Sequence, residues 1–246
     1  MKAMVLAAGL GTRLQPYTID RPKALVTVEG KPLLAFILEK LAASGFDEVV
    51  INVHHFAEMI EEYLSKNDFG VKIHISDERS RLLDTGGGLL KAMPFLDGEE
   101  PFLVHNVDIL SNIDLGNLVK YHNEHSALAT LAVGKRDSSR HFLFDESMRL
   151  SGWRNNLTQK EIIPAKERGA LQPFAFAGIH VISPDFFRLI HAHGPFSIVD
   201  AYLSLCSNSL LKGFDTSSNF VIDVGKPKNL DRASEFVRSQ GVKSTL

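Results

Sequence analysis

The stretch AMVLAAGLGTRLQPYTIDRPKALV (residues 3–26) begins with an apolar run, continues through two glycines, and then carries the cations Arg13 and Lys23. Its first part, residues 3–8, is short and continuously apolar, which is typical of a strand buried on both faces of a parallel sheet. Glycine lets backbone N–H groups approach a ligand closely, and guanidinium and ammonium groups both bind phosphate oxygens. The stretch therefore predicts an anion site at the end of the first strand, with nucleotide phosphate as the favoured ligand.

Strands and helices alternate through the rest of the first half. The expected strands are residues 48–53, 71–76 and 101–108, and the expected helices are residues 31–45, 57–68 and 89–96, the last after a loop at 79–88. Short β-α-β connections of this kind predict an α/β fold, a doubly wound and mostly parallel mixed sheet with helices on both faces. Ligands of such sheets bind at the carboxyl ends of the strands.

The second half has a less regular pattern. The expected strands are residues 127–135, 171–183 and 219–225, with a hairpin at 141–153; the expected helices are 184–193, 197–208 and 226–240, and polar residues 154–170 are expected to form a loop. There is no internal repeat and no linker composition. We therefore expect residues 1–246 to form one domain, with a cleft between two lobes.

Bulk composition limits the class of protein. The net charge of −2 gives no general field that would gather nucleic acid or an anionic membrane, so neither is expected as a partner. The single cysteine, Cys206, lies in an apolar pattern and is interpreted as core, which fits a reducing compartment. No apolar run approaches the roughly 20 residues of a membrane span, and Gly9 and Gly11 interrupt the only candidate signal peptide. We expect a cytoplasmic protein, either a monomer or a homodimer.

Two familiar phosphate-binding loops do not fit residues 9–14. A Rossmann loop needs a third glycine where this chain has Leu14, and no acid ends the second strand, VVINVHH. A Walker loop needs a Gly-Lys-Ser/Thr sequence that is absent here. What remains is the extended pattern L-A-A-G-x-G-T-R-L-x-P, followed by P-K-x-L.

This extended pattern resembles the signature of the sugar-phosphate nucleotidyltransferases, also called nucleotide-diphosphate-sugar pyrophosphorylases. The resemblance continues through DTGGG (84–88), NVD (106–108), FAGIHVISP (176–184) and IDVG (222–225). It implies a glycosyltransferase-A-like fold, with a nucleotide-binding half at about 1–110 and a sugar-binding half at about 111–246. It also implies Mg²⁺-dependent transfer of a nucleoside monophosphate from a nucleoside triphosphate to a sugar 1-phosphate, with release of pyrophosphate. The short chain with TGGG is most similar to the N-acetylmuramate 1-phosphate uridylyltransferases of peptidoglycan recycling, and next to the mannose 1-phosphate guanylyltransferases.

The resemblance assigns roles to individual residues. Arg13 matches the residue that grips the β and γ phosphates, and Lys23 matches one that stabilises charge at the α-phosphate. Asp108 and Asp223, each at the end of an apolar strand, match a pair of Mg²⁺ ligands. The catalytic residues implied are Arg13, Lys23 and Asp108, and the nucleotide-binding residues implied are Leu6, Ala8, Gly9, Gly11, Thr12, Arg13, Lys23, Gly87 and Gly88.

The base and the sugar are less well defined. The exposed backbone of Gly87 and Gly88 is expected to hydrogen-bond the edge of the base. Glu78 matches an acid found upstream of TGGG in similar sequences, but a solvated surface acid fits equally well. The sugar neighbours suggested are Asn106, Asn155, Gly178 and Asp200.

Two departures from the family pattern concern the acceptor side. Val107 stands where relatives have Gly or Ala, and its β-branched side chain is expected to narrow the cleft. No E-K-P-like element lies between residues 140 and 170, so Lys160 and Lys166 are substitutes for a sugar-phosphate lysine by location only. Alternative activities are mannose 1-phosphate guanylyl transfer and glucose 1-phosphate uridylyl or thymidylyl transfer. A regulatory protein that binds a nucleotide sugar without turnover is the alternative from another class.

Overall fold

A computed structural model describes residues 1–164 and 169–243, and ten strands in these ranges form one mixed sheet. Its main path runs β11-β10-β9-β12-β6-β1-β4-β5; β8 joins this path at β12, and β13 pairs with β8. The four strands of the first half are β1 (Lys2–Leu6), β4 (Glu48–Val53), β5 (Lys72–Asp77) and β6 (Phe102–Asn106). They pair in parallel, so the carboxyl ends of all four lie at one edge.

The second half is mainly antiparallel, and β12 (Gln172–Ile182) joins it to the first. Along its length β12 pairs with β6, with β8 (Ala129–Gly134) and with β9 (Arg140–Phe144). The remaining strands of this sheet are β10 (Leu150–Asn155), β11 (Lys160–Ile162) and β13 (Leu211–Asp215). Two small ladders complete the strands: β2 (Thr27–Val28) with β3 (Lys31–Pro32), and β7 (Ile109–Ser111) with β14 (Val221–Asp223).

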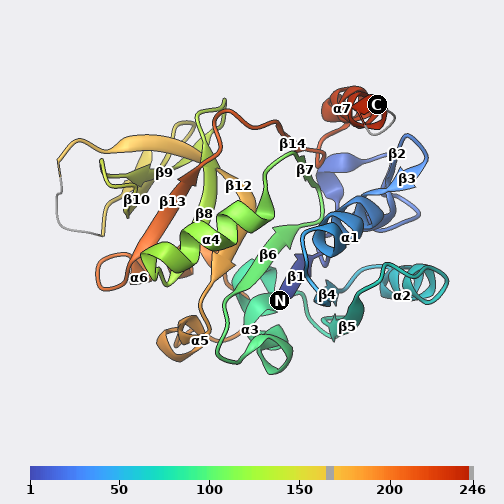
Figure 1. The fold of residues 1–246 in the computed structure, drawn as a ribbon, viewed down its shortest axis with the longest axis horizontal. Helices are drawn as coiled ribbons and strands as arrows, with labels where there is room; N and C mark the ends of the chain where they lie inside the picture. The colour runs from blue at the N-terminus through green and yellow to red at the C-terminus, as the bar shows by residue number, and fades with distance from the viewer. Residues whose placement is uncertain (165–168, 244–246) are drawn as a thin grey trace.

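Helices cover both faces of the sheet, as the sequence predicts. One core cluster includes side chains from α1 (Leu33–Ala43), α2 (Ala57–Ser65), α4 (Leu115–His125) and α7 (Leu230–Lys243). The other includes side chains from α3 (Asp84–Leu96), α5 (Asp185–Leu189) and α6 (Ile198–Leu205). Figure 1 shows the sheet crossing the molecule from β9 and β10 at one side to β5 at the other. None of the helices in the described ranges has the length and apolar composition needed to cross a bilayer.

The predicted strands agree with the structure to within a few residues, but two predicted loops differ. The glycines predicted as the end of a loop at 79–88 form the first turns of α3. Within the polar segment 154–170, residues 160–162 form the edge strand β11. We made no prediction for α4, β7 or β13. Lys166 lies outside the residues that the structure describes.

Candidate active site at the carboxyl ends of the strands

The carboxyl ends of β1, β4, β5 and β6 surround a pocket of about 400 Å³. The loop after β1 includes two short 3-10 helices, Thr12–Leu14 and Lys23–Leu25, and these bring Arg13 and Lys23 to the pocket. Its lining residues are Leu6, Ala8, Gly9, Arg13, Lys23, Asn52, Glu78, Leu82, Asp84, Thr85, Asn106, Asp108 and Pro195. Seven of the residues predicted from the sequence are therefore brought together here: Leu6, Ala8, Gly9, Arg13, Lys23, Asn106 and Asp108.

Lys23 and Asp108 form an ion pair inside this pocket. The Lys23 Nζ donates a hydrogen bond of 2.7 Å to Asp108 Oδ2, and both side chains are largely buried. Burial by itself would raise the pKa of the Asp108 carboxyl, but the charges of Lys23 and Arg13 outweigh it and hold this pKa below its usual range. Asp108 is therefore an anion at neutral pH, and Lys23 is held close to it.

Asp223 reaches the same place through the β7–β14 ladder. Asp223 pairs with Ile109, the residue after Asp108, and the Val224 N–H donates to the Asp108 carbonyl oxygen at 2.8 Å. Gly225 follows, and a Cβ placed on it would lie 2.7 Å from Asp223 Oδ1 and 2.8 Å from Asp108 Oδ2. The two carboxylates therefore converge on one point beside Gly225. The Arg13 Nη2 lies 3.4 Å from that point.

These two carboxylates fit a magnesium ion better than a structural metal. No group of three or more His, Cys, Asp or Glu side chains in the described ranges is arranged to hold a metal. Mg²⁺ in phosphate-transfer sites commonly takes one or two carboxylates and completes its shell with water and phosphate oxygens. A pair of carboxylates beside a pocket that also presents Arg13 and Lys23 for phosphate oxygens has that composition.

A buried polar network holds the loop that follows β1. Asn52 Oδ1 accepts hydrogen bonds from the N–H groups of Ala7 at 2.7 Å and Ala8 at 3.3 Å. Asn52 Nδ2 donates to Glu78 Oε1 at 2.7 Å, and the Leu83 N–H donates to Glu78 Oε2 at 3.0 Å. The Glu78 side chain is buried, so it is not a solvated surface acid. Asn52 and Glu78 therefore connect the first strand end to the start of α3.

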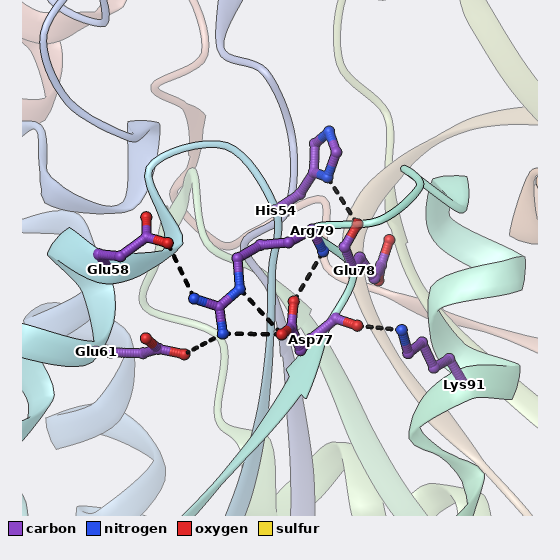
Figure 2. Close-up of polar contacts among 7 residues, drawn as sticks. All are labelled: His54, Glu58, Glu61, Asp77, Glu78, Arg79 and Lys91. Carbon is purple, nitrogen blue, oxygen red and sulfur yellow. Dashed lines mark hydrogen bonds and ion pairs between the residues drawn. The ribbon is translucent and has the colours of Figure 1, made fainter.

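The backbone around Glu78 is fixed from outside the pocket as well. Figure 2 shows Arg79 bridging Asp77 to Glu58 and Glu61 of α2. The carbonyl oxygen of Glu78 accepts a hydrogen bond from His54 Nδ1 at 2.8 Å, which makes Nδ1 the protonated nitrogen of that ring. These contacts tie the loop after β5 to α2, so the backbone that carries the Glu78 side chain is fixed as well.

The prediction that Gly87 and Gly88 expose their backbone to the base is wrong. Both residues are buried in α3, and the N–H groups of Gly86 and Gly87 donate to the carbonyl oxygen of Phe196. A side chain at Gly86 would overlap the Phe196 ring, and one at Gly87 would overlap the carbonyl oxygen of Gly194. A Cβ on Gly88 would lie 2.6 Å from Glu78 Oε1. The three glycines let α3 pack closely, and Asp84 and Thr85 at its start face the pocket instead.

The predicted sugar neighbours lie in different places. Gly178, with φ of +73°, sits against Asn106, because a Cβ there would lie 2.7 Å from Asn106 Nδ2. Asn155 ends β10 and accepts hydrogen bonds from the N–H groups of Leu157 and Thr158, so it forms a turn. Asp200 is exposed on α6. Asn155 and Asp200 do not line the pocket.

Val107 does not narrow the cleft as we predicted. Its side chain is fully buried in the core cluster that α1, α2, α4 and α7 share, and its N–H donates to the Leu6 carbonyl oxygen at 3.2 Å. The β-branched side chain points into the core, where such residues pack well. Lys160 is exposed on the edge strand β11 and does not line the pocket.

The two other residues predicted to bind the nucleotide, Gly11 and Thr12, do not line the pocket but support the loop after β1. Gly11 has φ of +69°, and a Cβ on it would lie 3.0 Å from Thr18 Cγ2, so both conformation and packing require glycine. Thr12 begins the first 3-10 helix and is exposed. Gly11 and Thr12 therefore shape the turn that delivers Arg13.

Several site residues were not assigned a role from the sequence, among them Asn52, Gly225 and Pro195. Asn52 carries a signal in hindsight, because it is a polar residue within the apolar strand VVINV. Gly225 lies two residues after Asp223, and its role becomes apparent only when both carboxylates are in place. Pro195 lies in a segment without any motif and reaches the pocket through tertiary packing.

Arg136 lies close enough to the carboxylate pair for the charge of Asp223 to act on it. It follows β8, and its Nη2 donates to the carbonyl oxygen of Phe176 in β12, two residues before Gly178. Burial lowers the pKa of this guanidinium, and the charge of Asp223 partly offsets the effect. Arg136 is thus a cation held near Asp223 by a main-chain carbonyl.

The comparisons with known proteins agree with this geometry. The family model described as "Nucleotidyl transferase" matches residues 2–144. The chain is 34% identical over 225 residues to N-acetylmuramate alpha-1-phosphate uridylyltransferase of Caulobacter vibrioides, with 86% of each chain covered. It is 30% identical over 257 residues to UTP–glucose-1-phosphate uridylyltransferase of Synechocystis, which covers 99% of this chain and 65% of that protein.

A solved structure supports the fold independently. The crystal structure of HddC from Yersinia pseudotuberculosis superposes with a TM-score of 0.78 at 22% sequence identity. The superposition covers 96% of this chain and 99% of that chain. At this level of identity, the comparison shows a shared fold, which extends over both halves of the sheet.

Proposed function

This chain belongs to the nucleotidyl transferase family, and we propose from this premise that it transfers a uridylyl group from UTP to N-acetylmuramate 1-phosphate. The products are the nucleotide sugar and pyrophosphate. The observation that carries the proposal is the convergence of Arg13, Lys23, Asp108 and Asp223 at one end of a pocket of about 400 Å³. Two cations and two carboxylates at one place suit a substrate with several phosphates.

The reaction needs positioning and charge neutralisation more than proton transfer. An oxygen of the sugar phosphate attacks the α-phosphorus of the nucleotide, the bond from that phosphorus to the bridging oxygen breaks, and pyrophosphate leaves with the electron pair. The attacking group is already an anion, so no general base is required. Transfers of this type are accelerated by alignment and by fixed charges around the phosphates.

Arg13 and Lys23 have different roles in this proposal. The planar fork of Arg13 suits two phosphate oxygens at once, so Arg13 binds the departing β and γ phosphates. Lys23 provides a compact charge deeper in the pocket and acts at the α-phosphate. Because Asp108 holds the Lys23 ammonium at 2.7 Å, Lys23 is positioned before the substrate arrives.

Asp108 and Asp223 would hold Mg²⁺ in this proposal. When bound, the ion neutralises charge on the phosphate oxygens during the transfer. The Asp108 and Asp223 carboxylates supply the protein ligands, and the Gly225 N–H, which donates to Asp223 Oδ1 at 2.8 Å, fixes the orientation of the second carboxylate.

Muramate is favoured as the acceptor by the relative from Caulobacter vibrioides, whose printed name carries this substrate and with which the alignment covers 86% of both chains. Glucose 1-phosphate is the second candidate, because the relative from Synechocystis is named for it. Both proteins are named as uridylyltransferases, so uridylyl transfer is the better supported half of the proposal.

The test is pyrophosphate release in Mg²⁺ across a grid of nucleoside triphosphates and sugar 1-phosphates. The acceptors are the 1-phosphates of N-acetylmuramate, N-acetylglucosamine, glucose and mannose. We expect release with UTP and N-acetylmuramate 1-phosphate, and loss of at least about 100-fold in Asp108→Asn, because the variant removes one carboxylate and the partner of Lys23. Asp114→Asn, an exposed cap of α4, is the matched control and should keep turnover.

The outcomes separate the proposal from its rivals. Turnover with a different pair would keep nucleotidyl transfer and replace the substrates. Binding of a nucleotide sugar without turnover in any pair would favour the regulatory protein instead.

A further inference from the structure

A second hollow, of about 200 Å³, lies beside the carboxylate pair. Its charged lining is Lys135 and Arg136 from the loop after β8 and Arg232 from α7. Thr216, Ser217 and Asn219 add uncharged polar groups. We call these six residues the basic hollow.

The basic hollow opens at the same edge of the sheet as the proposed active site. Both β6 and β8 run antiparallel to β12, so the carboxyl ends of β6 and β8 point the same way. Val221, which also lines the hollow, is two residues before Asp223 on β14. Arg136 connects the two places, because it lines the hollow and its guanidinium is influenced by the charge of Asp223.

The cations of the hollow have no carboxylate partner within 4 Å in the part of the chain that the structure describes. Arg136 donates to the main-chain carbonyl of Phe176, and the Lys135 ammonium lies 5.6 Å from the centre of the Phe174 ring. Asp215 accepts hydrogen bonds from the amide and hydroxyl groups of Ser217, but its carboxylate does not line the hollow. Three gathered cations without a direct ion-pair partner repel one another, and a bound anion would offset that repulsion.

We propose that the basic hollow binds a second anionic group of the acceptor, a carboxylate attached to the sugar. This inference rests on the proposed function, with the 1-phosphate of the same acceptor near Asp108 and Asp223. Arginine forks match a carboxylate in two parallel hydrogen bonds, and the hydroxyl and amide groups of the hollow supply further donors. N-acetylmuramate 1-phosphate carries a carboxylate on its lactyl ether, and N-acetylglucosamine 1-phosphate is the same sugar without it.

The size of the hollow favours an acidic substituent over a second nucleotide. Its volume of about 200 Å³ is smaller than the 400 Å³ of the nucleotide pocket. The only aromatic ring among its lining residues, Phe220, stacks on Phe236 of α7, with ring centres 4.2 Å apart, so that face is occupied by the protein itself. A carboxylate needs neither the volume nor the stacking surface.

The test compares the two acceptors, which differ by the lactyl carboxylate, in Arg136→Gln and Arg232→Gln. Calorimetry measures binding of each acceptor, and pyrophosphate release with UTP and Mg²⁺ measures kcat/KM. We expect the wild type to prefer the acceptor with the carboxylate by about tenfold or more, and each variant to lose about tenfold with that acceptor alone. The KM for UTP should stay unchanged. Arg238→Gln is the matched control, because it removes one positive charge from the same helix as Arg232 but pairs with Glu29 instead of lining the hollow.

Equal affinity of the wild type for both acceptors would overturn the inference, as would equal losses with both acceptors in the two variants. Arg232 is exposed, so Arg232→Gln remains informative even if Arg136→Gln fails to fold. Turnover of both acceptors without preference would support nucleotidyl transfer and contradict binding of the acceptor carboxylate in the basic hollow. Selective binding of the acceptor with the carboxylate, without any turnover, would support carboxylate binding in the basic hollow and contradict the proposed function.

Discussion

Gly225 is the residue on which the geometry of the carboxylate pair depends most directly. A Cβ at this position would lie within 2.8 Å of oxygens from both Asp108 and Asp223, closer than carbon and oxygen approach without displacement. We predict that Gly225→Ala lowers kcat/KM for nucleotidyl transfer by about 100-fold, because it pushes apart the groups proposed to hold the metal. Steady-state pyrophosphate release measures the effect.

The control for this variant is Gly116→Ala on the exposed surface of α4, where the added carbon meets only Asp114 Oδ1 at 3.3 Å. It should keep wild-type activity. Wild-type turnover in Gly225→Ala would show that the two carboxylates need not converge for the reaction.

Glu78 is a second single residue whose chemistry can be tested. Both of its carboxylate oxygens accept hydrogen bonds, from Asn52 Nδ2 and from the Leu83 N–H. Glu78→Gln keeps the shape but has only one acceptor oxygen, so one of these buried donors then faces an NH₂ group. We predict a loss of about 1–3 kcal/mol in the free energy of unfolding, measured in urea, and a higher KM for the nucleotide.

Glu58→Gln is the comparison for Glu78→Gln. Glu58 is exposed and shares Arg79 with Asp77 and Glu61, so its loss leaves Arg79 with two partners (Figure 2). The free energy of unfolding of Glu58→Gln should stay close to that of the wild type. Equal stability of Glu78→Gln and wild type would mean that the buried network does not hold the loop.

The elements were predictable where the pattern of a single segment determines them. The apolar strands β1, β4, β5 and β6 and the amphipathic helices α1 and α2 have periods that a local window reveals. The start of α3 was missed because three glycines favour a loop by their intrinsic conformational freedom, whereas here packing against Phe196 and Gly194 decides. The edge strand β11 was missed because two of its three residues, Lys160 and Glu161, are polar and exposed.

The residues of the candidate site likewise divide into those that a local motif reveals and those that depend on tertiary structure. Arg13, Lys23 and Asp108 follow strands with a recognisable motif, and the structure brings them together. Asn155 and Asp200 do not line the pocket, and the sequence could not reveal this because it gives no measure of how far β10 and α6 lie from β6. The buried pairing of Asn52 with Glu78 depends on two strands meeting in register, which no local pattern reveals.

Three buried histidines on β6, β12 and α4 link the stability of these elements to pH. Burial lowers the pKa of His105 to about 3, of His180 to about 3 and of His122 to about 4. The unfolded chain therefore binds more protons than the folded protein once the pH falls below about 6.5. Stability is present in full above that pH and decreases as the pH falls towards 4, by up to about 1.4 kcal/mol per pH unit for each histidine.

We predict a falling melting temperature between pH 7 and pH 5 and a shallower fall in His180→Gln. Glutamine keeps an acceptor for the Tyr202 hydroxyl, which hydrogen-bonds His180 Nδ1, but it does not titrate. Burial raises the pKa of Tyr202 well above its ordinary value, so the hydroxyl remains a donor throughout. The exposed His191→Gln is the control and should keep the wild-type slope. Equal slopes in His180→Gln and wild type would contradict the assignment.

The two halves of the chain share one sheet, and this predicts how the protein unfolds. Strand β12 pairs with β6 in the first half and with β8 and β9 in the second half, and each core cluster contains residues from both halves. Neither half can open without breaking β12 ladders and exposing apolar surface, so we expect one cooperative transition.

Far-UV circular dichroism reports all elements, whereas fluorescence of Trp153, the single tryptophan, reports β10. The two urea midpoints should coincide, and UTP with Mg²⁺ at about 100 times its dissociation constant should stabilise both by about 2.7 kcal/mol. Two separate midpoints, or a shift in the circular dichroism signal alone, would show that the halves are independent domains.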